Sequence, residues 1–342
     1  MRVDETAAPL AVCLGRAGLD LYARERDVPF AQVRSFEKHV GGSPANIAFG
    51  LARLGVRTAF VGRVSDDMIG RWVRDALAAE GIDVSGVVLD GTGTRTSLAV
   101  TEMRAHDCGV VIHRHAAADL ALTSEDIDAE RLAGAALLVL SGTALASEPS
   151  RGAAFAAARA ARSGGARVVL DLDYRAYTWA SLAEAREVCG RAAREADVVI
   201  GNGEEMALLR EGSSEEVAGE DAALVAALHE AGVSLVCIKA GEAGSRAWPR
   251  GGEPLVQPAF AVDVVKPFGA GDAYAAALCA GLLRDEPLGA TLERAAAAAA
   301  IVVASGACGD ASPSGAEIDA FVDAARANAR TRQNDVSEVT HG

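Results

Sequence analysis

The sequence predicts an α/β fold: a three-layer α/β/α sandwich with a mostly parallel central sheet and a small β lid. Residues 136–240 alternate short apolar runs with amphipathic segments of helix length, as in strands joined by crossover helices. Residues 87–115 instead hold two short apolar runs around a polar turn, which predicts an antiparallel hairpin. Half of the residues are hydrophobic but only 4% are aromatic, so Ala, Val and Leu must fill the core.

The 342 residues carry a net charge of −14, which argues against nucleic acid or an anionic membrane surface as the main partner. We predict one domain over 10–327, with lid segments at about 20–40 and 87–115. The polar stretches 1–9 and 328–342 are expected to be flexible tails. We see no leader-like or membrane-spanning apolar run, so a cytoplasmic protein is expected.

The N-terminal half begins with a buried strand over 11–14, and Asp20 follows beyond its carboxyl end. In open α/β sheets this edge binds ligands. The segment 41–46, Gly-Gly-Ser-Pro-Ala-Asn, precedes an apolar helix over 47–54, with its Ser as N-cap and its Pro as the first helical residue. The glycines permit close approach of a ligand, which Asn46 would face. An ordinary turn before a helix explains these residues equally well.

The remaining elements follow the same alternation of strand and helix. Strands are expected at 58–64, 136–141, 166–171, 196–201, 234–240, 247–249 and 255–262. Helices are expected at 68–80, 150–163, 181–195, 204–210, 222–232, 288–305 and 313–327. Polar groups follow three of the strands, at 171–175, 202–205 and 239–244. Each group is weak evidence alone, but their common place at strand ends indicates one ligand edge.

Residues 266–283 pass from a polar, Gly-rich turn into an Ala-rich apolar helix. The first N–H groups of a helix lack internal partners and lie at the positive end of its dipole, so this turn is suited to an anion. Asp272 lies in the same turn. A carboxylate base beside an anion site suits phosphoryl transfer to an alcohol. By itself, Asp272 is explained better as an ordinary N-cap.

Four motifs in this order make the chain resemble the ribokinase/PfkB carbohydrate kinase family over about 10–327. They are Gly41-Gly42-Ser43-Pro44-Ala45-Asn46, Asn202-x-x-Glu205, Lys239-x-Gly241-x-x-Gly244 and Gly269-Ala270-Gly271-Asp272. The resemblance implies a ribokinase-like sandwich with a β lid and ATP-dependent phosphorylation of a primary hydroxyl on a sugar-like substrate. It also implies a homodimer that pairs through the lids.

The resemblance also implies roles for single residues. Asp272 would be the base, and the N–H groups of Gly269, Ala270 and Gly271 would hold the γ-phosphate. The residues implied to hold substrate hydroxyls are Asp20, Asn46, Gly41 and Gly42. The residues implied to bind ATP are Asn202, Glu205, Lys239, Gly241 and Gly244. Asn202 and Glu205 would also position Mg²⁺ through waters, since this ion dehydrates reluctantly.

Within the family, the segments 15–21, 141–146 and 171–179 are similar to the subgroup that phosphorylates the 6-hydroxyl of 5-dehydro-2-deoxy-D-gluconate in inositol catabolism. The match departs at Pro267 and Ala176, where Thr and Pro are usual. Ketogluconate kinases of the family resemble this chain at Arg114 and Arg175, and Arg16 is a third candidate. Because guanidinium groups bind carboxylates in bidentate fashion, these arginines favour a small acidic sugar as substrate.

Several alternatives remain open. A 2-dehydro-3-deoxygluconate kinase or a fructokinase-like enzyme would differ in substrate alone. A non-catalytic sugar-binding module on the same fold is disfavoured by the intact Asp272 and Gly269–Gly271. A nicotinamide dehydrogenase would need a Gly-rich fingerprint directly after the first strand, and residues 15–18 lack its third glycine.

Lys266 departs from the family pattern. Many members bind a monovalent cation near the anion turn, using an acidic residue six positions before the catalytic aspartate, and here that position is Lys266. An ammonium group there could replace the charge of the cation. The substitution therefore predicts an enzyme that does not need K⁺.

Overall fold

A computed structural model describes residues 8–104, 108–210, 220–266, 268–305 and 312–339. Within these residues, one sheet has nine strands in the order β13-β12-β11-β10-β9-β8-β1-β4-β5. Its strands are β1 (Leu10–Leu14), β4 (Arg57–Ser65), β5 (Asp83–Asp90), β8 (Leu137–Ser141), β9 (Arg167–Asp171), β10 (Val198–Asn202), β11 (Leu235–Lys239), β12 (Ser245–Pro249) and β13 (Leu255–Gln257). All neighbours pair parallel except β11–β12 and β12–β13.

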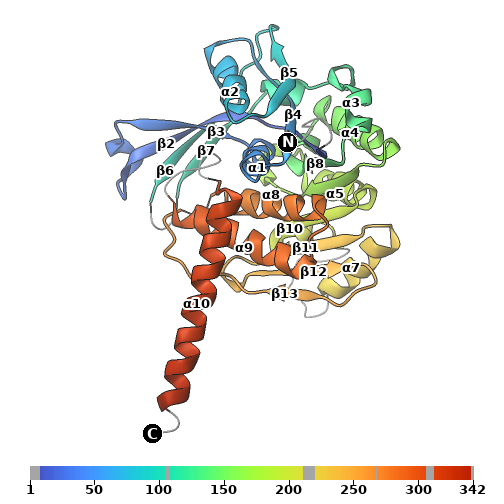
Figure 1. The fold of residues 1–342 in the computed structure, drawn as a ribbon. Helices are drawn as coiled ribbons and strands as arrows, with labels where there is room; N and C mark the ends of the chain where they lie inside the picture. The colour runs from blue at the N-terminus through green and yellow to red at the C-terminus, as the bar shows by residue number, and fades with distance from the viewer. Residues whose placement is uncertain (1–7, 105–107, 211–219, 267, 306–311, 340–342) are drawn as a thin grey trace, which may run out of the picture.

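Helices cover both faces of this sheet (Figure 1). The first face packs against α1 (Ser43–Arg53), α2 (Met68–Ala79), α8 (Ala270–Leu283), α9 (Leu288–Ala304) and α10 (Gly315–Val339). The second packs against α3 (Ala129–Ala133), α4 (Ser150–Ser163), α5 (Leu182–Glu195), α6 (Gly203–Ala207) and α7 (Glu220–Glu230). Each residue of the central strands β1 and β8 is buried, and these strands are apolar except for Ser141 at the end of β8. The predicted sandwich is confirmed.

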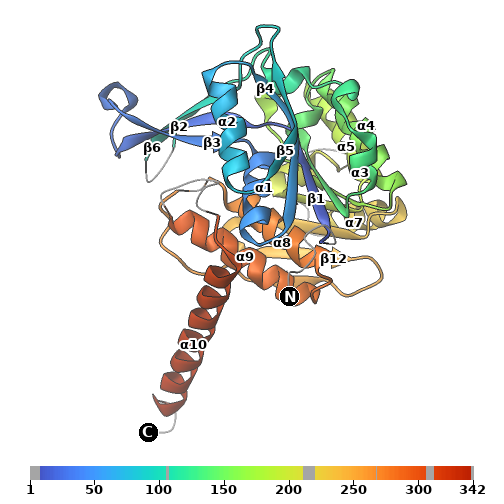
Figure 2. The ribbon, with the colours of Figure 1, turned by 45° about the horizontal axis from the view of Figure 1, so that its top comes forward.

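A second sheet, the lid sheet, projects from the body (Figures 1 and 2). It has the order β3-β2-β6-β7. Its strands are β2 (Gly18–Arg26), β3 (Phe36–Gly41), β6 (Leu98–Met103) and β7 (Val110–His113). The predicted hairpin is the antiparallel pair β6–β7. Residues 87–90, which the sequence pattern placed in the lid, instead pair with β4 at the edge of the large sheet.

The chain ends differ from the expected tails. Helix α10 continues to Val339, so residues 328–339 are helical, and the helix projects away from the body in both views (Figures 1 and 2). The rest of the expected tails, at 1–7 and 340–342, and Pro267 lie outside the described residues. No helix among the described residues is both long enough and apolar enough to cross a membrane.

The strand order of the large sheet reverses at β1. From β1 the chain builds β4 and β5 on one side, and from β8 onward it builds the other side. Ligands bind outside the carboxyl ends of strands at such a reversal. The segments after β1, β8, β9, β10 and β11 therefore converge on one region.

Candidate active site

The anion turn stands at the start of α8. Gly269 is the N-cap with φ of 82°, a left-handed conformation that favours glycine. Within the described residues no side chain caps this helix end. The first N–H groups of α8 are therefore open to an anion from outside the chain. A Cβ atom at Gly271 would lie 3.2 Å from Lys239 Nζ, so the lysine ammonium lies directly against the turn.

Asp272 and Asn46 meet because α1 and α8 pack very closely. A Cβ atom at Gly50 of α1 would lie only 2.5 Å from the Cβ of Ala276 in α8. Asn46 and Asp272 each lie one turn before this contact, on the same faces. Asn46 Nδ2 donates to Asp272 Oδ2 at 2.7 Å, and Asn46 Oδ1 is buried without a partner in the described structure. That oxygen is available to accept a hydrogen bond from a substrate hydroxyl.

The surroundings of Asp272 suit a general base. Burial and the nearby Asp173 and Asp171 carboxylates together raise its pKa to about 7, although hydrogen bonds from Asn46 and Ser43 favour the charged form. A base works best when its pKa is close to the operating pH. The residue is part of the first turn of α8 and does not cap the helix, so the N-cap explanation of Asp272 is wrong.

A cluster of carboxylates surrounds two cations beside the turn. Lys239 Nζ donates to Asp171 at 3.1 and 3.3 Å. Burial lowers the pKa of Lys239, but Asp171 and Glu205 outweigh burial and raise it, so the ammonium stays charged. Arg175 lies 2.8 Å from Asp173 and 3.7 Å from Glu205. Asp171 and Asp173 belong to the 171–175 group that the sequence placed at the ligand edge, although no role was predicted for either residue.

Asn202 and Glu205 occupy the start of α6. Asn202 Oδ1 accepts from the Glu205 N–H at 2.9 Å, and Glu205 Oε2 accepts from the Asn202 N–H at 2.8 Å. This reciprocal capping box explains their spacing of three residues. It leaves Glu205 Oε1 facing Arg175.

The glycines after β11 differ in their surroundings. Gly241 has open space around it, as expected next to a ligand. A Cβ atom at Gly244 would lie 2.1 Å from the Gln257 carbonyl oxygen of β13. Gly244 is therefore required by sheet packing.

Arg16 and Asp20 lie at the base of the lid. Arg16 Nη2 donates to Asp20 Oδ1 at 3.3 Å, and Arg16 Nε donates to Ser97 Oγ at 2.8 Å. A Cβ atom at Gly41 would overlap the Asp20 carboxylate, and one at Gly42 would lie 2.3 Å from the Arg16 carbonyl oxygen. The paired glycines thus let Arg16 and Asp20 approach the backbone closely. The cap of α1 is Gly42 and not Ser43.

Arg114 follows β7 and is 7% exposed. Arg114 Nε donates to Asp119 Oδ2 at 2.8 Å, and Nη2 lies 2.6 Å from the same oxygen. Nη2 also donates to the Thr143 carbonyl at 2.9 Å. The third nitrogen, Nη1, is buried with no partner among the described residues. A buried, unpaired guanidinium N–H is costly unless a ligand accepts from it.

The three predicted arginines all act electrostatically on one tyrosine. Partial burial raises the pKa of the Tyr177 hydroxyl, whereas Arg16, Arg175 and Arg114 lower it. All three guanidinium groups therefore lie within electrostatic reach of one hydroxyl, although they come from segments far apart in the chain. Tyr177 was not predicted as a site residue, and its place two residues after Arg175 was its only sequence signal.

Lys266 is almost completely buried and lies beneath the lid sheet. Its ammonium lies 5.4 Å from the centre of the Tyr22 ring of β2. The ammonium also lowers the pKa of Asp20, which burial raises. Phe268 packs against the same lid cluster. The segment before the anion turn is therefore in contact with the lid.

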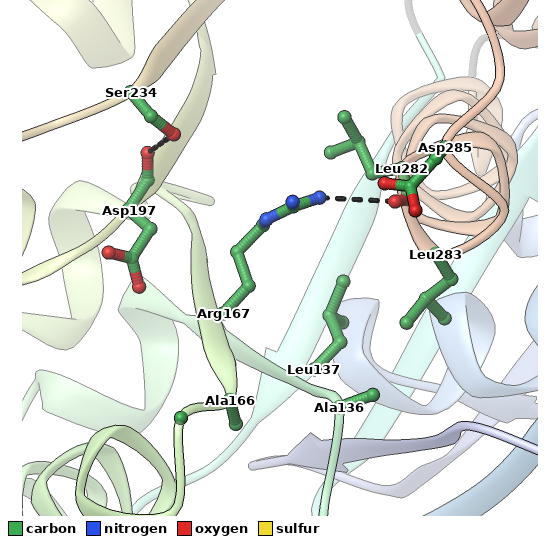
Figure 3. Close-up of a pocket in the computed structure, with 10 residues that line it drawn as sticks. Ala136, Leu137, Ala166, Arg167, Asp197, Ser234, Leu282, Leu283 and Asp285 are labelled. Atoms are coloured by element: carbon green, nitrogen blue, oxygen red, sulfur yellow. Dashed lines mark hydrogen bonds between the residues drawn. The ribbon is translucent and has the colours of Figure 1, made fainter.

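A separate cavity of about 370 Å³ opens near the amino ends of the central strands, on the side of the sheet opposite to the candidate site (Figure 3). It lies between the starts of β8 and β9 and the end of α8. Arg167 reaches across it and donates to the Leu282 carbonyl at 3.1 Å. None of the predicted site residues lines this cavity.

Comparison with known proteins agrees with this fold. The family model described as pfkB family carbohydrate kinase matches residues 8–315. The chain belongs to the pfkB family of carbohydrate kinases. It is 42% identical over 323 residues to a protein of Geobacillus kaustophilus named 5-dehydro-2-deoxygluconokinase, covering 94% of this chain and 96% of that protein.

Solved structures have the same architecture. A PfkB protein from Polaromonas sp. is 28% identical with a TM-score of 0.79, and the match covers 92% of this chain and 99% of that one. A double mutant of Vibrio cholerae fructokinase, solved with fructose, ADP and a potassium ion, is 26% identical with a TM-score of 0.79. That match covers 94% of this chain and all of the other, so the ribokinase-like fold extends over nearly the whole sequence.

Proposed function

We propose that this kinase transfers the γ-phosphoryl group of ATP to the 6-hydroxyl of 5-dehydro-2-deoxy-D-gluconate. The observation that supports this substrate most strongly is the buried Arg114 guanidinium, whose Nη1 has no partner among the described residues. Arg16 and Arg175 act electrostatically on the same Tyr177 hydroxyl as Arg114. Three guanidinium groups are suited to binding a carboxylate, whereas a neutral sugar would not need so many charged donors. The name of the Geobacillus kaustophilus relative supports the same acid sugar.

In this proposal Asp272 takes the proton from the 6-hydroxyl as that oxygen attacks phosphorus. The open N–H groups at Gly269, Ala270 and Gly271 hold the γ-phosphate oxygens, on which negative charge develops. Lys239 lies against this turn and adds a positive charge. Asn46 holds Asp272 in place and accepts from the substrate through its unpaired oxygen.

The charge balance of the site also fits Mg²⁺ brought in with ATP. Four carboxylates, Asp171, Asp173, Glu205 and Asp272, surround the cations Lys239 and Arg175. No group of three acidic, His or Cys side chains among the described residues could enclose a metal alone. Phosphate oxygens and waters would therefore supply most ligands, with Glu205 and Asn202 behind them. When bound, the ion neutralises charge on the transferred phosphate.

A pH dependence follows from the pKa of Asp272, which burial raises to about 7. The base works only when ionised, so kcat/KM is expected to rise through pH 7 and to fall about tenfold per pH unit well below it. Initial rates from pH 5 to 9 at low sugar concentration measure this limb. An acid limb near pH 4, the ordinary carboxyl range, would contradict the assignment of Asp272 as a buried base.

Lys266 leads to a prediction about monovalent cations. A buried ammonium already supplies positive charge beside Asp20 and the segment before the anion turn. Replacing K⁺ by tetramethylammonium is expected to change kcat by less than about twofold, since the charge is part of the chain. The comparison is made at constant ionic strength. A several-fold higher rate in K⁺ would contradict this role of Lys266.

A coupled ADP-release assay over a panel of sugars tests the proposed substrate. We expect 5-dehydro-2-deoxygluconate to give the highest kcat/KM, above 2-dehydro-3-deoxygluconate and fructose. A preference for either of the other two would replace the proposed substrate within the same mechanism.

We further propose a cytoplasmic homodimer joined through the lid sheet. Sedimentation of the purified chain would test whether it is a dimer.

A further inference from the structure

Asp173 adopts a conformation that costs free energy. It follows β9 and has φ of 33°, a left-handed conformation that is uncommon outside glycine. The residue is only 7% exposed. A strained, buried carboxylate persists only where the surrounding structure holds it, and such residues cluster at functional sites.

Both carboxylate oxygens of Asp173 have specific partners. Oδ1 lies 2.8 Å from Arg175 Nη2. Oδ2 accepts from Ser141 Oγ at 2.9 Å and from Thr143 Oγ1 at 3.2 Å. The turn at 141–143 in turn presents the Thr143 carbonyl to Arg114. One carboxylate therefore fixes Arg175 directly and Arg114 through Thr143.

We propose that Asp173 is a positioning residue that aims Arg175 and the 141–143 turn, and through it Arg114, at the acid group of the sugar. This inference rests on the proposed function, because it assumes a substrate that carries a carboxylate. Without Asp173, the half-exposed Arg175 side chain would keep Glu205, at 3.7 Å, as its acidic ion-pair partner among the described residues. Its guanidinium would then spend less time in the geometry that binds the substrate.

Asp173 has a second effect that a purely structural residue would lack. Its negative charge helps to raise the pKa of Asp272. The other groups that act on Asp272 come from several elements: Asn46 and Ser43 of α1, Asp171 of β9, Lys239 of β11 and Arg175 after β9. Removing the charge of Asp173 alone therefore shifts the Asp272 pKa downward.

The test is Asp173→Asn, because Asn also tolerates left-handed backbone and can still accept from Ser141 and Thr143. We expect KM for the acid sugar to rise about tenfold or more, as for loss of a charged hydrogen bond. KM for ATP should stay within about twofold. The acid limb of kcat/KM should move down by about one pH unit, as for loss of one nearby like charge.

The matched control is Asp197→Asn. Asp197 directly precedes β10, at the amino ends of the strands and away from the candidate site, and its carboxylate accepts from the Val168 N–H at 2.8 Å. The substitution should lower thermal stability without moving KM or the acid limb. If Asp173→Asn behaves in the same way, Asp173 has a structural role only and the inference is overturned. A double variant with Arg175→Gln should show less than the product of the two single KM effects, and full additivity would also overturn it.

The wild-type assay separates this inference from the proposed function. Absence of turnover with any acid sugar in the wild-type enzyme would refute the proposed function, and the KM effect assigned to Asp173 with it. Efficient wild-type turnover together with unchanged KM and pH limb in Asp173→Asn would refute the inference about Asp173 alone.

Discussion

Replacing Asp272 with Asn is expected to lower kcat by about 10³-fold, which lies within the usual contribution of general-base catalysis. The amide cannot take the proton of the 6-hydroxyl, so the attacking oxygen remains a poor nucleophile. Because Asn keeps the shape of the side chain, KM for sugar and for ATP should change by less than about threefold. Steady-state kinetics with the acid sugar varied at saturating ATP, and with ATP varied at saturating sugar, measure these parameters.

The stability of the same variant provides its control. Burial and the neighbouring carboxylates disfavour the charged form of Asp272 in the folded protein. A neutral amide removes that repulsion, so the melting temperature of Asp272→Asn should equal or exceed the wild-type value. A stable, folded variant with undiminished kcat would show that another group is the base.

The second large effect is expected for Arg114→Lys. Lysine keeps one positive charge beside Asp119 but loses the planar fork, including the unpaired Nη1. Loss of one hydrogen bond to a charged group costs about 1.5–3 kcal/mol, so KM for the acid sugar should rise about 10- to 100-fold. The kcat value should change little, because the reacting hydroxyl is held elsewhere in the site.

Arg104→Lys is the matched control, since Arg104 follows the lid strand β6 but is 39% exposed and lies 3.7 Å from Glu102. Its kinetics should remain within about twofold of wild type, as expected for an exposed ion pair. An equally small effect at Arg114 would indicate that the carboxylate is bound elsewhere or that the substrate is neutral.

Much of the fold was predictable because burial dictates residue type. Strands such as β8 and β9 are covered on both faces, so they appear in the sequence as short apolar runs with polar residues at their ends. The lid boundary was less predictable. The 87–90 segment belongs to β5, whose alternating burial at the sheet edge resembles that of a half-buried lid strand. Pairing with β4 places this segment in the large sheet, and the local sequence does not show which strand a segment pairs with.

The candidate site was predictable where short motifs follow one another in an order typical of a family. Asp272 and Asn46 were both identified, and the structure brings them to 2.7 Å across 226 residues of sequence. Their contact depends on the close approach of Gly50 to Ala276, and no local sequence motif predicts that approach. Asp119 was missed, and Asp173 was placed at the ligand edge without a role, because acidic side chains are common on protein surfaces. Only tertiary packing shows that these two are buried against Arg114 and Arg175.

The most direct test of the account is the identity of the product. The purified enzyme is incubated with ATP, Mg²⁺ and 5-dehydro-2-deoxygluconate, and the product is examined by ³¹P NMR with proton coupling. We expect one sugar phosphate to form for each ADP. Its phosphorus should couple to the two protons of one CH₂ group, as a 6-phosphate requires. ADP release without a sugar phosphate, or a phosphorus coupled to a single CH proton, would contradict phosphorylation at the 6-hydroxyl.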